Sequence, residues 1–214
     1  MLHTCPRAPR KRWEKDLGKT FTDKEWEECL GMVKKISRNT RLKFTQFNYI
    51  HQAYLDPAKI TRMFGGTNRK CPRCTSNNPT FYHMVWQCRT IEALWIRIIE
   101  HINRTLHRGL TPDPAICLLG LIKRPSKKKA GNRMIDLTLG VMRKSIARQW
   151  KNPIGPTYED WFRESERWAR AEGVAIAEEE ALGIRKQPLS DTWGEVQQAF
   201  TLAKEGGPRS RTGI

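Results

Sequence analysis

The sequence predicts a mainly α-helical protein, a helical domain with a small Cys₃His zinc knuckle inserted between its helices. Two observations support this fold class. Apolar residues recur at helical spacing in several segments, and a cluster of Cys and His residues with metal-ligand spacing interrupts that pattern near residue 80. The 214 residues are enough for one compact domain, or for one domain with poorly packed ends.

The helices are placed by the spacing of their apolar residues. Six are expected, over residues 23–37, 41–55, 57–64, 91–106, 135–150 and 156–182. Thr22 and Thr157 each have an acidic residue three positions later, which is the spacing of a capping box at a helix start. In the second helix, Phe47 is expected to point inward. The apolar run 115–122 is too short to assign to a helix or a strand.

Four parts are expected along the chain. Residues 1–20 are basic and should form an arm without a core of its own. Residues 21–155 should form the helical zinc-binding domain, and 156–182 an amphipathic helix. Residues 183–214 should be a weakly structured tail, within which Trp193 opens a possible short helix.

The charge of the chain points to a polyanionic partner. The net charge is +17, and residues 1–151 hold 31 Lys+Arg against 11 Asp+Glu, so the first two thirds carry the basic surface. No apolar run is long enough to span a bilayer, and no apolar segment follows the first basic residues as in a secretory signal. We therefore expect an intracellular protein of the nucleus or cytoplasm, with no membrane partner and no small-molecule substrate.

Four potential metal ligands lie within eighteen residues: Cys71, Cys74, His83 and Cys88. Two cysteines separated by two residues form a knuckle whose turn points both sulfurs at one centre, and the second pair completes a tetrahedron. Three thiolates and one imidazole fill all four positions of Zn²⁺, which leaves no place for an activated water. The sequence thus predicts one structural zinc ion and no enzyme activity. Buried thiols with a core histidine, or a redox Cys-X-X-Cys, are the alternatives.

The segment from Lys70 to Trp95 resembles the zinc-knuckle segment at the C-terminal end of LINE-type (non-LTR) retrotransposon reverse transcriptases. It combines Lys-Cys-Pro-Arg-Cys, a polar loop, and Phe-Tyr-His-Met-Val-Trp-Gln-Cys. The resemblance covers about residues 10–155. Weaker similarities flank the knuckle segment, at Arg12-Trp13, Asp16-Leu17-Gly18, Trp26, residues 54–60 and residues 147–151. Pro72 departs from the family, which often has an aromatic residue there.

The resemblance implies the accessory end of such an enzyme without its polymerase and endonuclease domains. No adjacent Asp-Asp pair, which the polymerase would need for its metals, occurs in the sequence. The implied role is to hold element RNA, together with the rest of a retrotransposon ribonucleoprotein, and not to synthesise DNA.

Nine basic residues are candidates for contacts with RNA or single-stranded nucleic acid: Arg69, Lys70, Arg73, Arg89, Lys127, Lys128, Lys129, Arg143 and Lys144. The first four flank the ligands and could meet phosphates or only offset the charge of the zinc site. The lysines at 127–129 could contact phosphates, serve in nuclear import, or form a solvated loop. The last two would extend a basic helix face.

The aromatic residues beside the ligands can likewise be structural or can contact nucleic acid. Phe81, Tyr82 and Trp86 could pack around the metal or stack on unpaired bases. The alternative function is a zinc-stabilised protein-interaction module with no direct nucleic-acid contact. In that case the helix carrying Trp161 and Trp168 would dock a partner protein.

Overall fold

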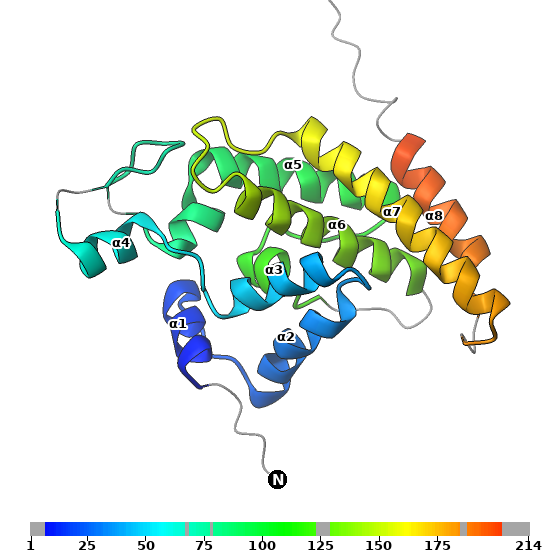
Figure 1. The fold of residues 1–214 in the computed structure, drawn as a ribbon. Helices are drawn as coiled ribbons and strands as arrows, with labels where there is room; N and C mark the ends of the chain where they lie inside the picture. Colours follow the sequence, from blue (N-terminus) through cyan, green and yellow to red (C-terminus); the bar gives the residue numbers. More distant parts are fainter. Residues whose placement is uncertain (1–6, 67–68, 78, 123–128, 185–187, 203–214) are drawn as a thin grey trace, which may run out of the picture.

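The computed structural model describes residues 7–66, 69–77, 79–122, 129–184 and 188–202 (Figure 1). Within these ranges it contains helices and one isolated antiparallel bridge, but no strand, so the prediction of a mainly α protein is confirmed. The α-helices are α1 (Arg7–Leu17), α2 (Asp23–Lys35), α3 (Thr40–Ile50), α4 (Pro57–Phe64), α5 (Arg89–Leu106), α6 (Lys129–Arg148), α7 (Tyr158–Ala181) and α8 (Ser190–Leu202). Two π-helical turns, η1 (His83–Gln87) and η2 (Ala115–Leu119), complete the described elements.

Helix α6 is the centre of the fold. It packs against α3, α7 and α8, and Figure 1 shows it running through the middle of the molecule. Every residue from Met134 to Arg143 is buried, as expected of a helix surrounded by others. The neighbouring segment approaches α6 closely at Gly140, where an added Cβ would lie 2.6 Å from Cδ1 of Ile36. Any larger residue here would have to displace the buried side chain of Ile36, so packing and not backbone conformation favours glycine.

The predicted helix starts are present. The Thr22 hydroxyl accepts from the N–H of Glu25, and the Glu25 carboxylate accepts from the N–H of Thr22, which is a complete capping box. The Thr157 hydroxyl likewise accepts from the N–H of Asp160. The Asp160 carboxylate, however, accepts from Arg163 at 2.6 Å, so only half of the second box is made.

The N-terminal segment differs from the expected arm. Residues 7–17 form α1, and Trp13 on it is fully buried, with its indole N–H donating to the carbonyl of Ile50 at 2.9 Å. One large ring is enough to dock a short helix that has no apolar stripe, which is why periodicity missed it. The expectation of an arm is corrected for these residues, whereas residues 1–6 lie outside the described ranges.

The end of the chain also differs from the expected weak structure. Helix α8 packs on α7, with Trp193 and Phe200 buried. The indole of Trp193 donates to the carbonyl of Ala169, and the ring of Phe200 stacks on Phe162 at 5.5 Å between centroids. The short helix near the C-terminus is therefore part of the core, and residues 203–214 lie outside the described ranges.

Phe47 was expected inside and lies outside. Helix α3 ends at Ile50 and buries Leu42 and Tyr49, which turns Phe47 to the surface with 46% of it exposed. The run 115–122 begins with the π-helical turn η2, which decides between the two assignments left open. None of the described helices combines the length and apolar character needed to cross a membrane.

Candidate metal centre

The first two ligands lie in a tight turn. Lys70 and Asn77 form the isolated antiparallel bridge that closes it. Inside the bridge, the N–H of Cys71 donates to the carbonyl of Ser76 at 2.8 Å, and the N–H of Thr75 donates back to the carbonyl of Cys71 at 3.1 Å. Thr75 has a φ of +62°, the left-handed conformation that such a return requires. The backbone of the knuckle is thus closed by its own hydrogen bonds.

The second pair of ligands brackets a π-helical turn. His83 and Cys88 are five residues apart, and in an α-helix this spacing rotates two side chains about 140° away from each other. In η1 the N–H of Cys88 instead donates to the carbonyl of His83 at 2.9 Å, an i to i+5 bond. The wider turn brings the two residues back to one side of the chain, so the π-helical geometry makes this ligand spacing usable.

The four ligand atoms meet at one point. They lie within 4.8 Å of one another, and among the described residues this is the one group of three or more His, Cys, Asp or Glu side chains so arranged. The sulfurs of Cys71 and Cys88 are 4.0 Å apart, and Nε2 of His83 is 3.2 Å from the sulfur of Cys74. Ligands about 2.3 Å from a tetrahedral ion lie about 3.8 Å from each other. The cluster therefore has the size of a site for one metal ion.

Two side chains hold the π-helical turn from outside. The widened turn offers carbonyls that an α-helix would pair within itself. The indole N–H of the fully buried Trp95 donates to the carbonyl of Val85 at 3.0 Å. The guanidinium of Arg73 donates to the carbonyl of Met84 at 2.5 Å. Both contacts stabilise the conformation in which the last two ligands converge.

Burial and Arg73 shift the pKa values of three of the four candidate ligands. Burial raises the pKa of the Cys74 thiol to about 11, and burial together with Arg73 lowers the pKa of His83. Burial would also raise the pKa of Cys88, but hydrogen bonds from the N–H of Thr90 and from Arg73 lower it overall. A neutral imidazole and one favoured thiolate suit metal binding, while Cys74 would lose its proton to an incoming cation.

The remaining described cysteines are unlike the ligands. Cys29 and Cys117 are fully buried, and neither belongs to the cluster. Burial raises the pKa of Cys29 to about 12 and that of Cys117 further, so both are protonated thiols packed in the core.

The aromatic residues beside the ligands pack into the protein. Phe81 is 2% exposed and contacts the rings of Trp13, Tyr49 and Tyr54, with centroids 5.5 to 6.3 Å apart. It is therefore a core residue and no platform for a base. The other two, Tyr82 and Trp86, are half-buried against the core. The metal centre is anchored to α1 and α3 through this cluster.

A pocket of about 440 Å³ opens beside the metal centre. It is lined by residues from the α3–α4 connection, α4, the knuckle, η1 and the segment after α6, namely Leu55, Pro57, Ile60, Arg69, Lys70, Pro72, Met84, Trp150 and Lys151. Trp150 and Lys151 were not among the predicted contacts. Because they stand more than 60 residues after the last ligand, Cys88, only their place in the resemblance could have indicated them.

The predicted nucleic-acid contacts near the metal centre differ in their exposure to solvent. Arg69, Lys70 and Arg89 are exposed. Arg73 is turned inward to η1, and its side chain also lies against Gly155, where an added Cβ would be 2.9 Å from Cδ of the arginine. The inward direction of the Arg73 side chain fits a role in supporting the metal centre better than a contact with phosphate.

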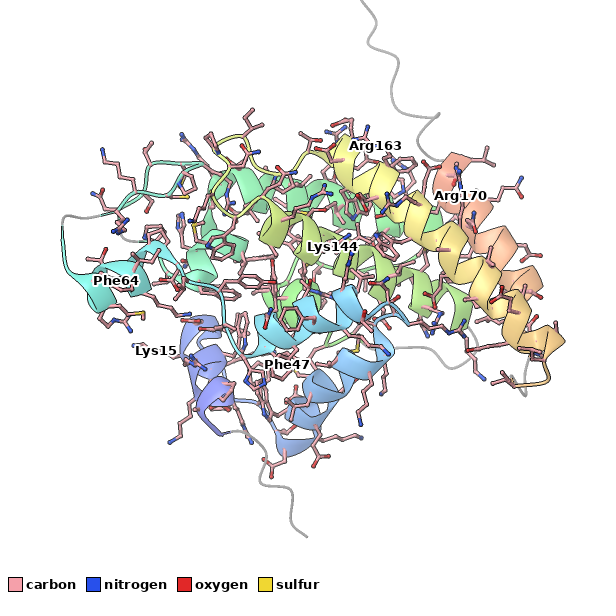
Figure 2. The ribbon with its side chains drawn as sticks, in the orientation of Figure 1. Lys15, Phe47, Phe64, Lys144, Arg163 and Arg170 are labelled. Carbon is pink, nitrogen blue, oxygen red and sulfur yellow. The ribbon has the colours of Figure 1, made fainter. Side chains whose placement is uncertain are left out.

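The contacts predicted further along the chain do not form one basic face. Arg143 is 1% exposed and donates to the carbonyl of Cys117 at 2.5 Å, so its assignment as a nucleic-acid contact is wrong. Lys144 lies between α6 and α7, 3.8 Å from the carboxylate of Glu164 and over the ring of Trp168 (Figure 2). Lys129 is exposed at the first turn of α6. The remaining two, Lys127 and Lys128, lie outside the described residues.

The fold and the site define a mainly α-helical protein with a Cys₃His group that could hold one metal ion. A scan against models of known protein families finds no match for the chain.

Proposed function

We propose that this chain is a non-catalytic, zinc-stabilised protein that binds RNA or other single-stranded nucleic acid beside its metal centre. The observation that carries the proposal is the pocket at the knuckle, whose lining combines the cations Arg69, Lys70 and Lys151 with the ring of Trp150. Cations around an aromatic ring are the combination that single-strand binding proteins use, with phosphates held by charge and a base by stacking.

The ring of Trp150 is held in place by two contacts. Its indole N–H donates to the carbonyl of Leu55 at 2.9 Å, and its ring stacks on Tyr54 with centroids 5.3 Å apart. A ring that is held in place loses little conformational freedom when a base binds. Lys70 and Lys151 are exposed and form no ion pair with any described residue, so both charges are available to phosphates.

The family resemblance also supports this pocket as the binding site. Three of the segments that carry it, residues 54–60, 70–72 and 147–151, each contribute to the lining of this pocket although they are far apart in the sequence. The proposed role is accordingly that of the accessory C-terminal part of a LINE-type reverse transcriptase, which holds RNA and performs no chemistry.

Zinc is the proposed metal because of the donor set. Three sulfurs and one imidazole at tetrahedral spacing suit Zn²⁺, and four protein ligands leave no position for a reacting water. A closed site of this kind contributes to folding, since the ion replaces thiol protons and ties the knuckle to η1.

Metal analysis with thermal melting tests the zinc site. We expect about one zinc per chain in the intact protein, and loss of the ion with several kcal/mol of stability in Cys74→Ser. Cys117→Ser is the matched control, because it also replaces a cysteine but should keep its zinc. An intact chain that stays folded without metal, or a control that loses zinc equally, would contradict the proposal.

Salt-dependent binding of a labelled 20-nucleotide oligouridylate tests the nucleic-acid site. Replacing Lys70 and Lys151 with Gln should reduce the slope of log affinity against log salt by about 1.4, because each lost phosphate contact removes about 0.7. The control with the same charge change replaces Lys11 and Lys15, exposed on α1. If both pairs behave alike, the alternative of a protein-interaction module without nucleic-acid contact is favoured.

A further inference from the structure

A second pocket, of about 400 Å³, lies at the opposite end of α6 from the metal centre. It is lined by six cationic side chains and three polar or acidic ones, namely Lys34, Lys35, Arg38, Lys43, Lys129 and Arg133 with Ser37, Asn132 and Asp136. We call this set the basic pocket. It combines residues from the end of α2, the start of α3 and the start of α6, and Lys129 is its one member among the nucleic-acid contacts predicted from the sequence.

The charge of the basic pocket is only partly compensated. Arg38 pairs with Glu179, and Arg133 pairs with Glu172, which fixes these two guanidinium groups in place. No described residue forms an ion pair with the three lysines that line the pocket from α2 and α3, which are Lys34, Lys35 and Lys43. Cations held this close repel one another, and a bound polyanion would relieve that repulsion.

Exposed aromatic rings continue from the basic pocket along α3. Lys43, Phe47 and His51 are four residues apart in turn, so they follow one face of the helix and its C-cap. Phe47 is 46% exposed at the surface (Figure 2), with its ring 4.3 Å from that of His51. Phe44, on the next face, is 65% exposed. Rings beside a cluster of cations are the stacking surface that unpaired bases use.

From this arrangement we infer a second single-strand binding site, in which the basic pocket holds phosphates and Phe44 and Phe47 stack on bases. The inference rests on the proposed function for the identity of its ligand. Helix α6 has 20 residues and is about 30 Å long. At about 3.4 Å per stacked nucleotide, a strand of roughly nine nucleotides has the length of this helix, which separates the two pockets.

The test measures binding of the 20-nucleotide oligouridylate to the full chain with Lys34, Lys35 and Lys43 replaced by Gln. The expected result is a salt slope lower by about 2, since three phosphate contacts are lost. The control has the same change in net charge and replaces Lys11, Lys15 and Lys24, which are exposed away from both pockets. Equal slopes for the two triple variants would overturn the second site.

The two proposals fail in different ways. If the basic-pocket variant matches its control while Lys70→Gln with Lys151→Gln still weakens binding, the second site is wrong and the proposed function stands. If the unaltered chain binds no oligonucleotide at any salt concentration, both are wrong.

A further variant separates a nucleic acid from a simple phosphate ligand. Phe44→Ala with Phe47→Ala removes two exposed rings, so the fold should remain. Binding of the oligouridylate should weaken at least about fivefold, because stacking on even one base contributes that much. Binding of inorganic tripolyphosphate should be unchanged. Equal affinity of the variant and the unaltered chain for the oligonucleotide would leave a phosphate pocket and overturn the assignment to nucleic acid.

Discussion

Trp95→Phe tests whether the π-helical turn determines metal affinity. The substitution keeps an aromatic ring in the core but removes the indole N–H that donates to the carbonyl of Val85 in η1. A buried carbonyl left without its partner is destabilised by about 1–3 kcal/mol. The turn can relieve this by relaxing toward α-helical pairing, which rotates His83 and Cys88 away from each other. We therefore expect zinc affinity to fall about 10- to 100-fold, which is the free energy of this lost hydrogen bond expressed as a change in affinity.

The matched control is Trp161→Phe. Trp161 is also fully buried, and its indole N–H donates to the carbonyl of Thr138 at 2.9 Å, far from the ligands in the sequence and in another part of the core. Both variants should therefore lose comparable stability without metal. The zinc affinity is measured by competition with a chromophoric chelator, and urea unfolding at a fixed free zinc concentration gives the linked stability. At saturating zinc, Trp95→Phe should lose an additional 1.4–2.8 kcal/mol or so.

Equal zinc affinities for the two variants would refute this reasoning. In that case the ligands would be held by the knuckle alone, and the π-helical turn would be a by-product of the sequence around it.

Three further predictions concern the core. Gly140→Ala should lower the melting temperature, because the new methyl group would lie 2.6 Å from Cδ1 of Ile36. Overpacking costs about 1–3 kcal/mol, which exceeds the gain of about 1 kcal/mol in helix propensity. A higher melting temperature would contradict this packing. Arg143→Gln should destabilise the chain by about 2 kcal/mol in urea unfolding and leave the salt slope of RNA binding unchanged, since this side chain is buried. Burial lowers the pKa of His101, which lies 2.7 Å from the Tyr158 hydroxyl, to about 4, below the value near 6.5 of an unfolded chain. Between pH 6.5 and 4 the unfolded chain binds a proton at this position and the folded chain does not. The free energy of unfolding is therefore unaffected above pH 6.5 and falls by about 3 kcal/mol as the pH drops to 4. In His101→Gln, stability should fall less steeply with acid than in the unaltered chain.

Local features of this protein could be predicted from the sequence. The capping box at Thr22 and the apolar stripe of α5 depend on residues within one or two turns of each other. The metal ligands fall within eighteen residues, and Cys-X-X-Cys spacing constrains the chain strongly. The error at Arg143 was also local, because this residue stands one helical turn after Leu139 and thus on a buried face.

Other features depend on contacts between distant segments. Helix α1 is held by one tryptophan, Trp13, whose indole N–H donates to the carbonyl of Ile50 at the end of α3. The periodicity of residues 7–17 does not predict this contact. The π-helical turn likewise depends on an indole from α5 and on the guanidinium of Arg73, both outside the turn itself. Neither side chain has a pattern that indicates this role before the chain is folded.

The sequence by itself therefore determined the helical class, the capped helix starts at Thr22 and Thr157 and the four candidate metal ligands, because each depends on neighbours close along the chain. Only the tertiary structure decided which cations share a surface. Packing around α6 brings residues 34–43 next to 129–133, and residues 55–60 and 69–72 next to 150–151. Contacts between segments about 80 to 100 residues apart are selected by the complementary shapes of buried faces, and these shapes exist only after the helices have packed together.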